Sequence, residues 1–115
     1  MNQTCCMQIL PQIFKIEELE KKDHIFEVVA DKYCIEILKS IMTKSKSVVE
    51  ITAETKIPMN TAYRRIQTLH DSNLVKTSGI ITDDGKRLFL YKSKIKGIEC
   101  NYNNGQLKVE LIPNQ

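Results

Sequence analysis

Polar and basic side chains crowd the stretch IPMNTAYRRIQTLHDSNLVKTSG, residues 57 to 79. Between them, Ala62, Ile66 and Leu69 recur at helical spacing. The polar members of the set are Asn60, Thr61, Tyr63, Arg64, Arg65, Gln67 and Thr68. We therefore predict a helix over about residues 58–72 that buries an apolar face and presents a polar, arginine-bearing face to solvent.

The outward side chains suit the base edges in the major groove of DNA. Arginine can bind guanine through two hydrogen bonds, asparagine can bind adenine in the same way, and a threonine methyl can contact the thymine methyl. The candidates for base contacts are Asn60, Thr61, Tyr63 and Arg64. The candidates for phosphate contacts, which set register and salt dependence, are Arg65, Thr68, Lys76, Lys86 and Arg87. For one residue of each group a structural role is the alternative: Tyr63 can pack beside a neighbouring hairpin, and Arg65 can pair with a scaffold carboxylate.

Positive charge gathers in the same part of the chain. Residues 56–96 contain nine lysines and arginines against three aspartates, a net +6, whereas the whole chain carries +3. A basic segment on a mildly acidic body predicts a localised contact with a polyanion, and a solvated charged face is the simpler alternative.

The segments before this helix predict the elements that position it. Asp31 is a suitable N-cap for a helix in DKYCIEILKSIM. Its core-facing residues are Cys34, Ile37, Leu38, Ile41 and Met42. Ser47 and Glu50 in SVVE form a capping box, so a short helix should begin there and end near Thr55, before Pro58. A short helix, a tight turn and a second helix have the form of a helix-turn-helix.

Upstream, residues 13–30 predict one amphipathic helix with a possible interruption near Asp23. Its apolar series is Ile16, Leu19, Phe26, Val29 and Ala30. Residues 1–12 predict a flexible lead, so residues 13–115 are expected to form a single domain.

Two hairpins should follow the outward-polar helix. An Asp-Gly turn joins β-prone runs over about residues 74–93, and an Asn-Gly turn predicts a second hairpin over about residues 97–112. In the second hairpin the turn pairs Tyr102 with Leu107, Cys100 with Val109 and Ile98 with Leu111 on one apolar face. The opposite face places Glu99 across from Glu110, which tolerates water but not burial. The predicted fold class is α+β.

Several function classes lack support in the sequence. No apolar run approaches the ~20 residues of a membrane span, and no secretory leader is present, so a cytoplasmic protein without membrane contact is expected. Cys5, Cys6, Cys34 and Cys100 lack paired metal-ligand spacing, so neither a metal nor a cofactor is expected. Oxidant or metal sensing by Cys5, Cys6 or Cys34 stays an alternative. Motifs of phosphate loops, zinc proteases or nucleophile elbows are absent, so an enzyme is not expected.

About residues 26–93 resemble the winged helix-turn-helix of prokaryotic, archaeal-type ArsR-like transcription regulators, with MarR-like regulators as second choice. The resemblance rests on FEVVADKYCIEILKSI, SVVEITAETKIPMNTAYRRIQTLHDSNLVKTSG and ITDDGKRLFLYKS. It implies a sequence-specific regulator of double-stranded DNA whose recognition helix spans about 58–72 and whose wing spans about 74–93. By position, Asn60, Thr61, Tyr63 and Arg64 would meet the major groove.

The chain departs from that family at three places. Residues 47–52 lack the cysteines of metal-sensing members, ADKYC replaces the usual ADPTR, and the hairpin at 98–111 replaces a C-terminal dimerisation helix. A homodimer on a pseudo-palindromic site is expected, with residues 13–30 as the first candidate for its interface and the terminal hairpin as the second. A small effector is left open. The competing function is a winged-helix protein-interaction module of a transcription assembly.

Overall fold

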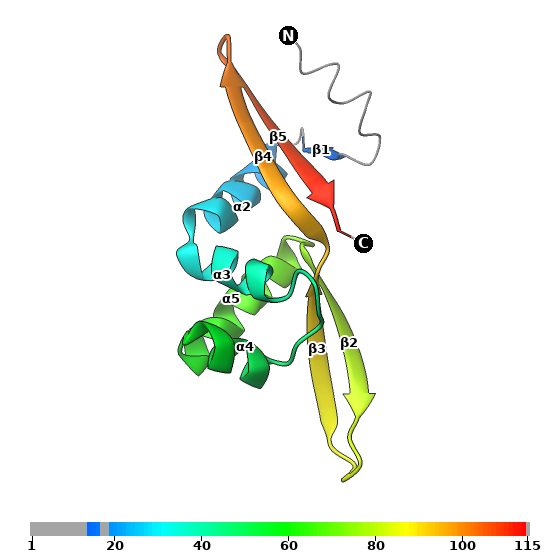
Figure 1. Cartoon of the computed structure of the whole chain (residues 1–115). Coiled ribbons are helices and arrows are strands. Elements are labelled where there is room, and N and C mark those ends of the chain that lie inside the picture. Colours follow the sequence, from blue (N-terminus) through cyan, green and yellow to red (C-terminus); the bar gives the residue numbers. More distant parts are fainter. Residues whose placement is uncertain (1–13, 17–18, 115) are drawn as a thin grey trace.

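The computed structural model describes residues 14–16 and 19–114 and shows an α+β fold, as predicted (Figure 1). The elements follow in the order β1 (Phe14–Ile16), α2 (Leu19–Ala30), α3 (Lys32–Ser40), α4 (Val48–Thr55), α5 (Met59–Asp71), β2 (Val75–Ile81), β3 (Arg87–Ser93), β4 (Ile95–Asn103) and β5 (Gln106–Pro113). The helices gather beside two hairpins that extend toward opposite ends of an elongated molecule of 56 × 25 × 22 Å.

The core lies where α3, α4 and α5 meet the base of the hairpins. The largest fully buried side chains are Ile37, Ile41, Ile51, Leu69, Leu74, Val28, Val109 and Cys34. Asp31 caps α3 as predicted, because its Oδ1 accepts hydrogen bonds from the backbone N–H groups of Tyr33 (2.9 Å) and Cys34 (3.2 Å). On α3 the side chains of Cys34, Ile37 and Leu38 are buried, which confirms the predicted inward face at these positions.

The helix-turn-helix forms through local signals. Ser47 Oγ accepts from Glu50 N (3.2 Å) and Glu50 Oε1 accepts from Ser47 N (3.0 Å), which completes the predicted capping box of α4. Lys56 then takes a left-handed conformation (φ 65°), and α5 begins after Pro58. A second left-handed residue, Asn73 (φ 61°), follows the C-cap of α5, where glycine or asparagine commonly ends a helix.

The first hairpin, β2 and β3, is called the wing below. Its strands pair from Val75 with Ser93 to Ile81 with Arg87. The backbone of Lys46 bonds that of Tyr91 in both directions (3.0 and 2.8 Å), so the segment before α4 joins β3 as an isolated bridge. This bridge fixes the wing against the helix-turn-helix.

The second hairpin has the predicted register. Tyr102 pairs with Leu107, Cys100 with Val109, and Ile98 with Leu111. Its strands belong to a three-stranded sheet in the order β1-β5-β4.

The expectation for residues 13–30 was partly wrong. Phe14–Ile16 form strand β1, paired with β5, instead of helix, because β5 offers them a free edge for backbone hydrogen bonds. α2 runs through Asp23 without a break. It buries Ile25 and Val28, while Val29 and Ala30 are exposed, so the inward face differs from the predicted one. Residues 1–12 lie outside the described part of the chain.

The terminal hairpin also differs from expectation in its burial. Glu110 is buried (9% exposed) because it lies on the central strand between β1 and β4, whereas Glu99 on the edge strand is exposed. Cys100, which was assigned to a packed apolar face, is exposed. The part of that face nearer the hairpin turn is therefore not packed against other described residues.

Candidate nucleic-acid interface

Helix α5 divides its side chains as the sequence indicated. Ala62, Ile66 and Leu69 are buried against the core. Asn60, Tyr63, Arg64 and Gln67 are exposed, and Thr61 and Thr68 are half-buried. The predicted base-contacting residues thus share the solvent-facing side of the N-terminal half of α5.

The adjacent Arg64 and Arg65 have different environments. Among the described residues no carboxylate pairs with the exposed Arg64 guanidinium. Arg65 Nε, by contrast, lies 2.7 Å from Asp31 Oδ2, and its guanidinium stands 5.7 Å from the centre of the Tyr33 ring. The structure thus places Arg65 against the α3 scaffold, in the pairing with a carboxylate that the sequence left open as an alternative.

Tyr63 projects from α5 near the wing strand β3. Its side chain is 55% exposed, yet it is close enough to Tyr91 of β3 to affect that residue's ionisation. Burial is the main cause that raises the pKa of Tyr91, and the negative charge of an ionised Tyr63 adds to it. Tyr63 is therefore accessible to a ligand and lies near the wing.

Three of the candidate phosphate ligands are exposed along the wing: Lys76, Lys86 and Arg87. Lys86 Nζ is 4.0 Å from Asp84 Oδ2, and both side chains are largely exposed, so this pair holds the lysine weakly. The Thr82 hydroxyl donates to Asp84 and is the main cause that lowers the pKa of that carboxyl.

A hollow beside the wing brings Lys92 and Lys94 next to Lys76, which is one of the predicted phosphate contacts. The hollow has a volume of about 440 Å³ and is lined by Lys76, Lys92 and Lys94, with Ser45, Ser78, Ser93 and Asn114. Lys94 Nζ donates to Asn73 Oδ1 (2.6 Å), which fixes it near the end of α5. The +6 charge of residues 56–96 was the only sequence signal for Lys94, because its neighbours in space come from three separate segments.

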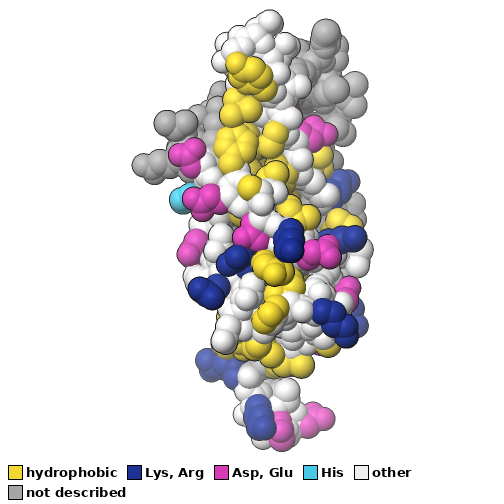
Figure 2. All heavy atoms as spheres, turned by 90° about the vertical axis from the view of Figure 1, so that its left-hand side faces the viewer, with side chains coloured by type: hydrophobic (Ala, Val, Ile, Leu, Met, Phe, Trp, Pro, Cys, Tyr) yellow, Lys and Arg dark blue, Asp and Glu magenta, His cyan; other side chains and the backbone are white. Residues whose placement is uncertain are grey.

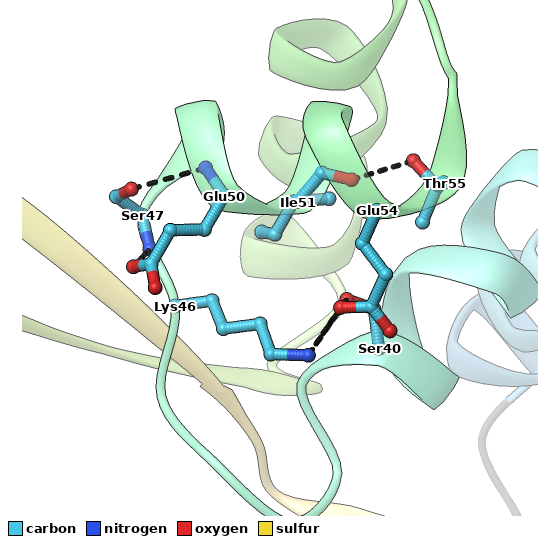
Figure 3. Close-up of polar contacts among 7 residues, drawn as sticks. All are labelled: Ser40, Lys46, Ser47, Glu50, Ile51, Glu54 and Thr55. Carbon is cyan, nitrogen blue, oxygen red and sulfur yellow. Dashed lines mark hydrogen bonds and ion pairs between the residues drawn. The ribbon is translucent and has the colours of Figure 1, made fainter.

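Polar contacts hold α3, α4 and the segment between them together (Figure 3). Lys46 Nζ pairs with Glu54, and Ser40 Oγ donates to Glu54 Oε1 (3.0 Å). Hydrogen bonds from Lys46 and then Ser40 are the causes that lower the pKa of Glu54. Because the backbone of Lys46 also bonds to β3, this cluster links α3, α4 and the wing.

The described residues give no support to a metal centre. Within them, no three His, Cys, Asp or Glu side chains come together as a possible metal site. Burial, helped by the nearby charge of Asp31, raises the pKa of the Cys34 thiol to about 11, so Cys34 is protonated at neutral pH and a poor nucleophile. Cys5 and Cys6, the other candidates for sensing, lie outside the described residues. No helix in the described part is both long and apolar enough to cross a membrane.

The sequence matches no family model and no curated protein. Among solved structures, the chain is similar to the crystal structure of NolR from Sinorhizobium fredii, with a TM-score of 0.54 and 14% identity over 84% of this chain and 81% of that one. At this identity the similarity shows a shared fold alone. That fold is the winged helix, in agreement with the arrangement of α4, α5 and the wing.

Proposed function

We propose that this winged-helix protein is a DNA-binding transcription regulator, with α5 as its recognition helix. The observation that carries the proposal is the exposed, polar N-terminal half of α5 beside a basic wing, where Arg64 pairs with no carboxylate of the described residues. A helix of a helix-turn-helix reads bases through its N-terminal residues in the major groove. The fold alone would not support a function, so the proposal rests on these side chains.

In this proposal the residues that contact DNA divide into two groups. Asn60, Thr61, Tyr63 and Arg64 contact base edges, and Arg64 contributes most to sequence preference because a guanidinium can bind guanine through two hydrogen bonds. Thr68, Lys76, Lys86, Arg87 and Lys94 contact phosphates. Arg65 orients α5 through Asp31 and does not touch DNA.

We propose more specifically that the protein is a cytoplasmic, ArsR-like, archaeal-type regulator that binds DNA as a homodimer. A single domain of this size offers few base contacts, so strong selectivity favours two copies on a pseudo-palindromic site, with recognition helices about 34 Å or a multiple of it apart. The ArsR-like sequence pattern over residues 26–93 supports this assignment.

The proposal is tested by selecting from a random pool of labelled DNA duplexes with the purified protein, at two salt concentrations. A selected pseudo-palindrome whose binding weakens steeply with salt would support a dimeric, sequence-specific regulator. Absence of binding to any duplex at low salt would refute the DNA-binding proposal.

A second candidate is a protein-interaction module. Exposed apolar side chains on the wing favour it: Ile81 is 74% exposed and Phe89 47%, and together with Ile80 and Gly79 they line a hollow of about 330 Å³. The same selection distinguishes the candidates, because an interaction module would show no salt-sensitive affinity for duplex DNA.

A further inference from the structure

The outer edge of strand β4 has no partner in the described part of the chain. β4 is the edge strand of the sheet β1-β5-β4 and runs for 9 residues, with a register irregularity only between Ile95 and Gly97. Long edge strands without proline pair readily with another strand. β4 therefore offers a template for backbone hydrogen bonds.

The turn of the hairpin determines which residues direct their backbone outward. Asn104 and Gly105 form a two-residue turn with positive φ at both positions (53° and 74°), so Asn103 and Gln106 are a hydrogen-bonded pair. Because such pairs alternate along an antiparallel ladder, Ile98, Cys100 and Tyr102 turn their N–H and C=O groups to the free edge. These three residues also share one face of the sheet.

That face is apolar, and it continues into a hollow beside the helices. Tyr102 is 74% exposed and Cys100 is exposed. At the base of β4, the half-buried Ile98 lines a hollow of about 320 Å³. Its other apolar walls are Val29, Ile35, Leu38, Met42 and Ile95. Figure 2 shows hydrophobic side chains in a run from the tip of this hairpin down over the helices.

We propose that β4 pairs antiparallel with β4 of a second copy of this chain, about a two-fold axis at Cys100. The two sheets become one six-stranded sheet in the order β1-β5-β4-β4-β5-β1. Tyr102 of each copy then lies opposite Ile98 of the other and covers the hollow there. This inference rests on the proposed function, because it places the dimer interface of the proposed regulator on the terminal hairpin.

The register follows from symmetry and from the side chains. A two-fold axis perpendicular to an antiparallel ladder must place one residue opposite itself. An axis at Glu99 would bring two carboxylates face to face, which is destabilising. An axis at Asn101 would place Tyr102 opposite Cys100, away from the hollow. The axis at Cys100 places Glu99 opposite Asn101 and Ile98 opposite Tyr102, so polar residues meet polar residues and apolar residues meet apolar ones.

The contact area is adequate for a specific dimer. A buried tyrosine contributes about 150–250 Å², so two Tyr102 rings and the walls that they cover approach the ~1,000 Å² expected of a specific interface, before the strand edges are counted. The hairpin extends away from the wing (Figure 1), so pairing through β4 leaves α5 and the wing open to DNA.

Cross-linking of Cys100 tests the register. The Cα atoms of a hydrogen-bonded antiparallel pair are about 5.5 Å apart, within the range for a disulfide. A Cys5→Ser/Cys6→Ser variant leaves Cys100 and the buried Cys34. We expect copper-phenanthroline oxidation to convert this variant to a covalent dimer, with Cys100→Ser in the same background as the control that stays monomeric on a denaturing gel.

Two substitutions at one position test the interface without weakening the hairpin. Asn101→Glu places a carboxylate opposite Glu99 of the second copy, while within its own hairpin it faces Lys108. We therefore expect it to raise the dimer dissociation constant about tenfold and to leave folding intact. Asn101→Lys places a positive charge opposite Glu99 of the second copy and opposite Lys108 of its own hairpin. Attraction then replaces repulsion across the interface, so the dimer should persist. Light scattering over a dilution series measures both.

The outcomes are distinct. A Cys100-linked dimer that Asn101→Glu weakens and Asn101→Lys does not would support pairing through β4. A monomeric wild-type protein, or a dimer that neither forms the Cys100 link nor responds to Asn101→Glu, would overturn it. DNA binding is read separately on a single half-site: if Asn101→Glu binds the half-site as wild type does, only the dimer is affected, whereas absence of binding by both refutes the proposed function.

Discussion

Replacing Arg65 with alanine should destabilise the fold more than it weakens DNA binding, and replacing Arg64 should do the reverse. The two residues are adjacent in sequence, but Arg65 is paired with Asp31 and Arg64 projects into solvent. Each variant therefore serves as the matched control for the other, since both remove one arginine from α5.

The expected loss of stability for Arg65→Ala follows from its contacts. The ion pair is partly exposed, with 31% of the Arg65 side chain and 27% of the Asp31 side chain accessible, so it contributes about 0.5–1 kcal/mol. The guanidinium over the Tyr33 ring adds a similar ~0.5–1 kcal/mol. Asp31 keeps its hydrogen bonds as the cap of α3, so no charge is left unsatisfied. The sum is about 1–2 kcal/mol, against less than about 0.5 kcal/mol for Arg64→Ala.

Urea unfolding measures the stability of both variants, and fluorescence anisotropy with the selected duplex measures their affinity. Arg64→Ala should lose sequence-specific binding at unchanged stability. If Arg65→Ala kept its stability and lost binding, Arg65 would belong to the DNA interface and the assignment of the two arginines would be refuted. A stability loss of several kcal/mol in Arg64→Ala would mean that α5 is rotated from the position described.

Ile66 is 4% exposed on the inner side of α5, so Ile66→Ala should cost about 2–5 kcal/mol in urea unfolding, and a neutral result would contradict its burial. The bond from the Ser47 backbone is the first cause that lowers the pKa of Glu50, so its charge stabilises the fold above the unfolded pKa and the benefit is lost as pH falls through the folded pKa. Glu50→Gln should therefore be less stable than wild type at pH 7, with the difference shrinking in acid; a gap in urea midpoints that stayed constant with pH would argue against this role. Lys86→Ala with Arg87→Ala should flatten the salt dependence of DNA binding equally on all duplexes, and unchanged slopes would remove the wing tip from the interface.

The predictions that held depend on short stretches of sequence. The capping box of α4 needs only Ser47 and Glu50, and the register of the terminal hairpin follows from its Asn-Gly turn. The inner face of α5 follows from the spacing of three apolar residues. In each case the residues that determine the structure are within a few positions of one another, so the sequence displays them directly.

The predictions that failed depend on distant partners. Phe14–Ile16 become a strand only because β5, at the other end of the sequence, accepts them. Glu110 is buried for the same reason, since β1 turns β5 from an edge strand into a central one. The pairing of Arg65 with Asp31, which the sequence left as one of two alternatives, likewise depends on α3 to bring Asp31 close. A periodic pattern predicts which face of an element is apolar, but it does not predict which neighbour a charged side chain will contact.

The pairing of β1 with β5 sets the order in which we expect the chain to fold. Both hairpins and the helix-turn-helix join residues that are near in sequence, so each closes a short loop. β1, by contrast, joins Phe14 to Leu111, across nearly the whole sequence, and this closure has the largest entropic cost. The central position of β5 should therefore be completed last, after the helices and the wing have formed, and its amide protons next to β1 should exchange before those that face β4.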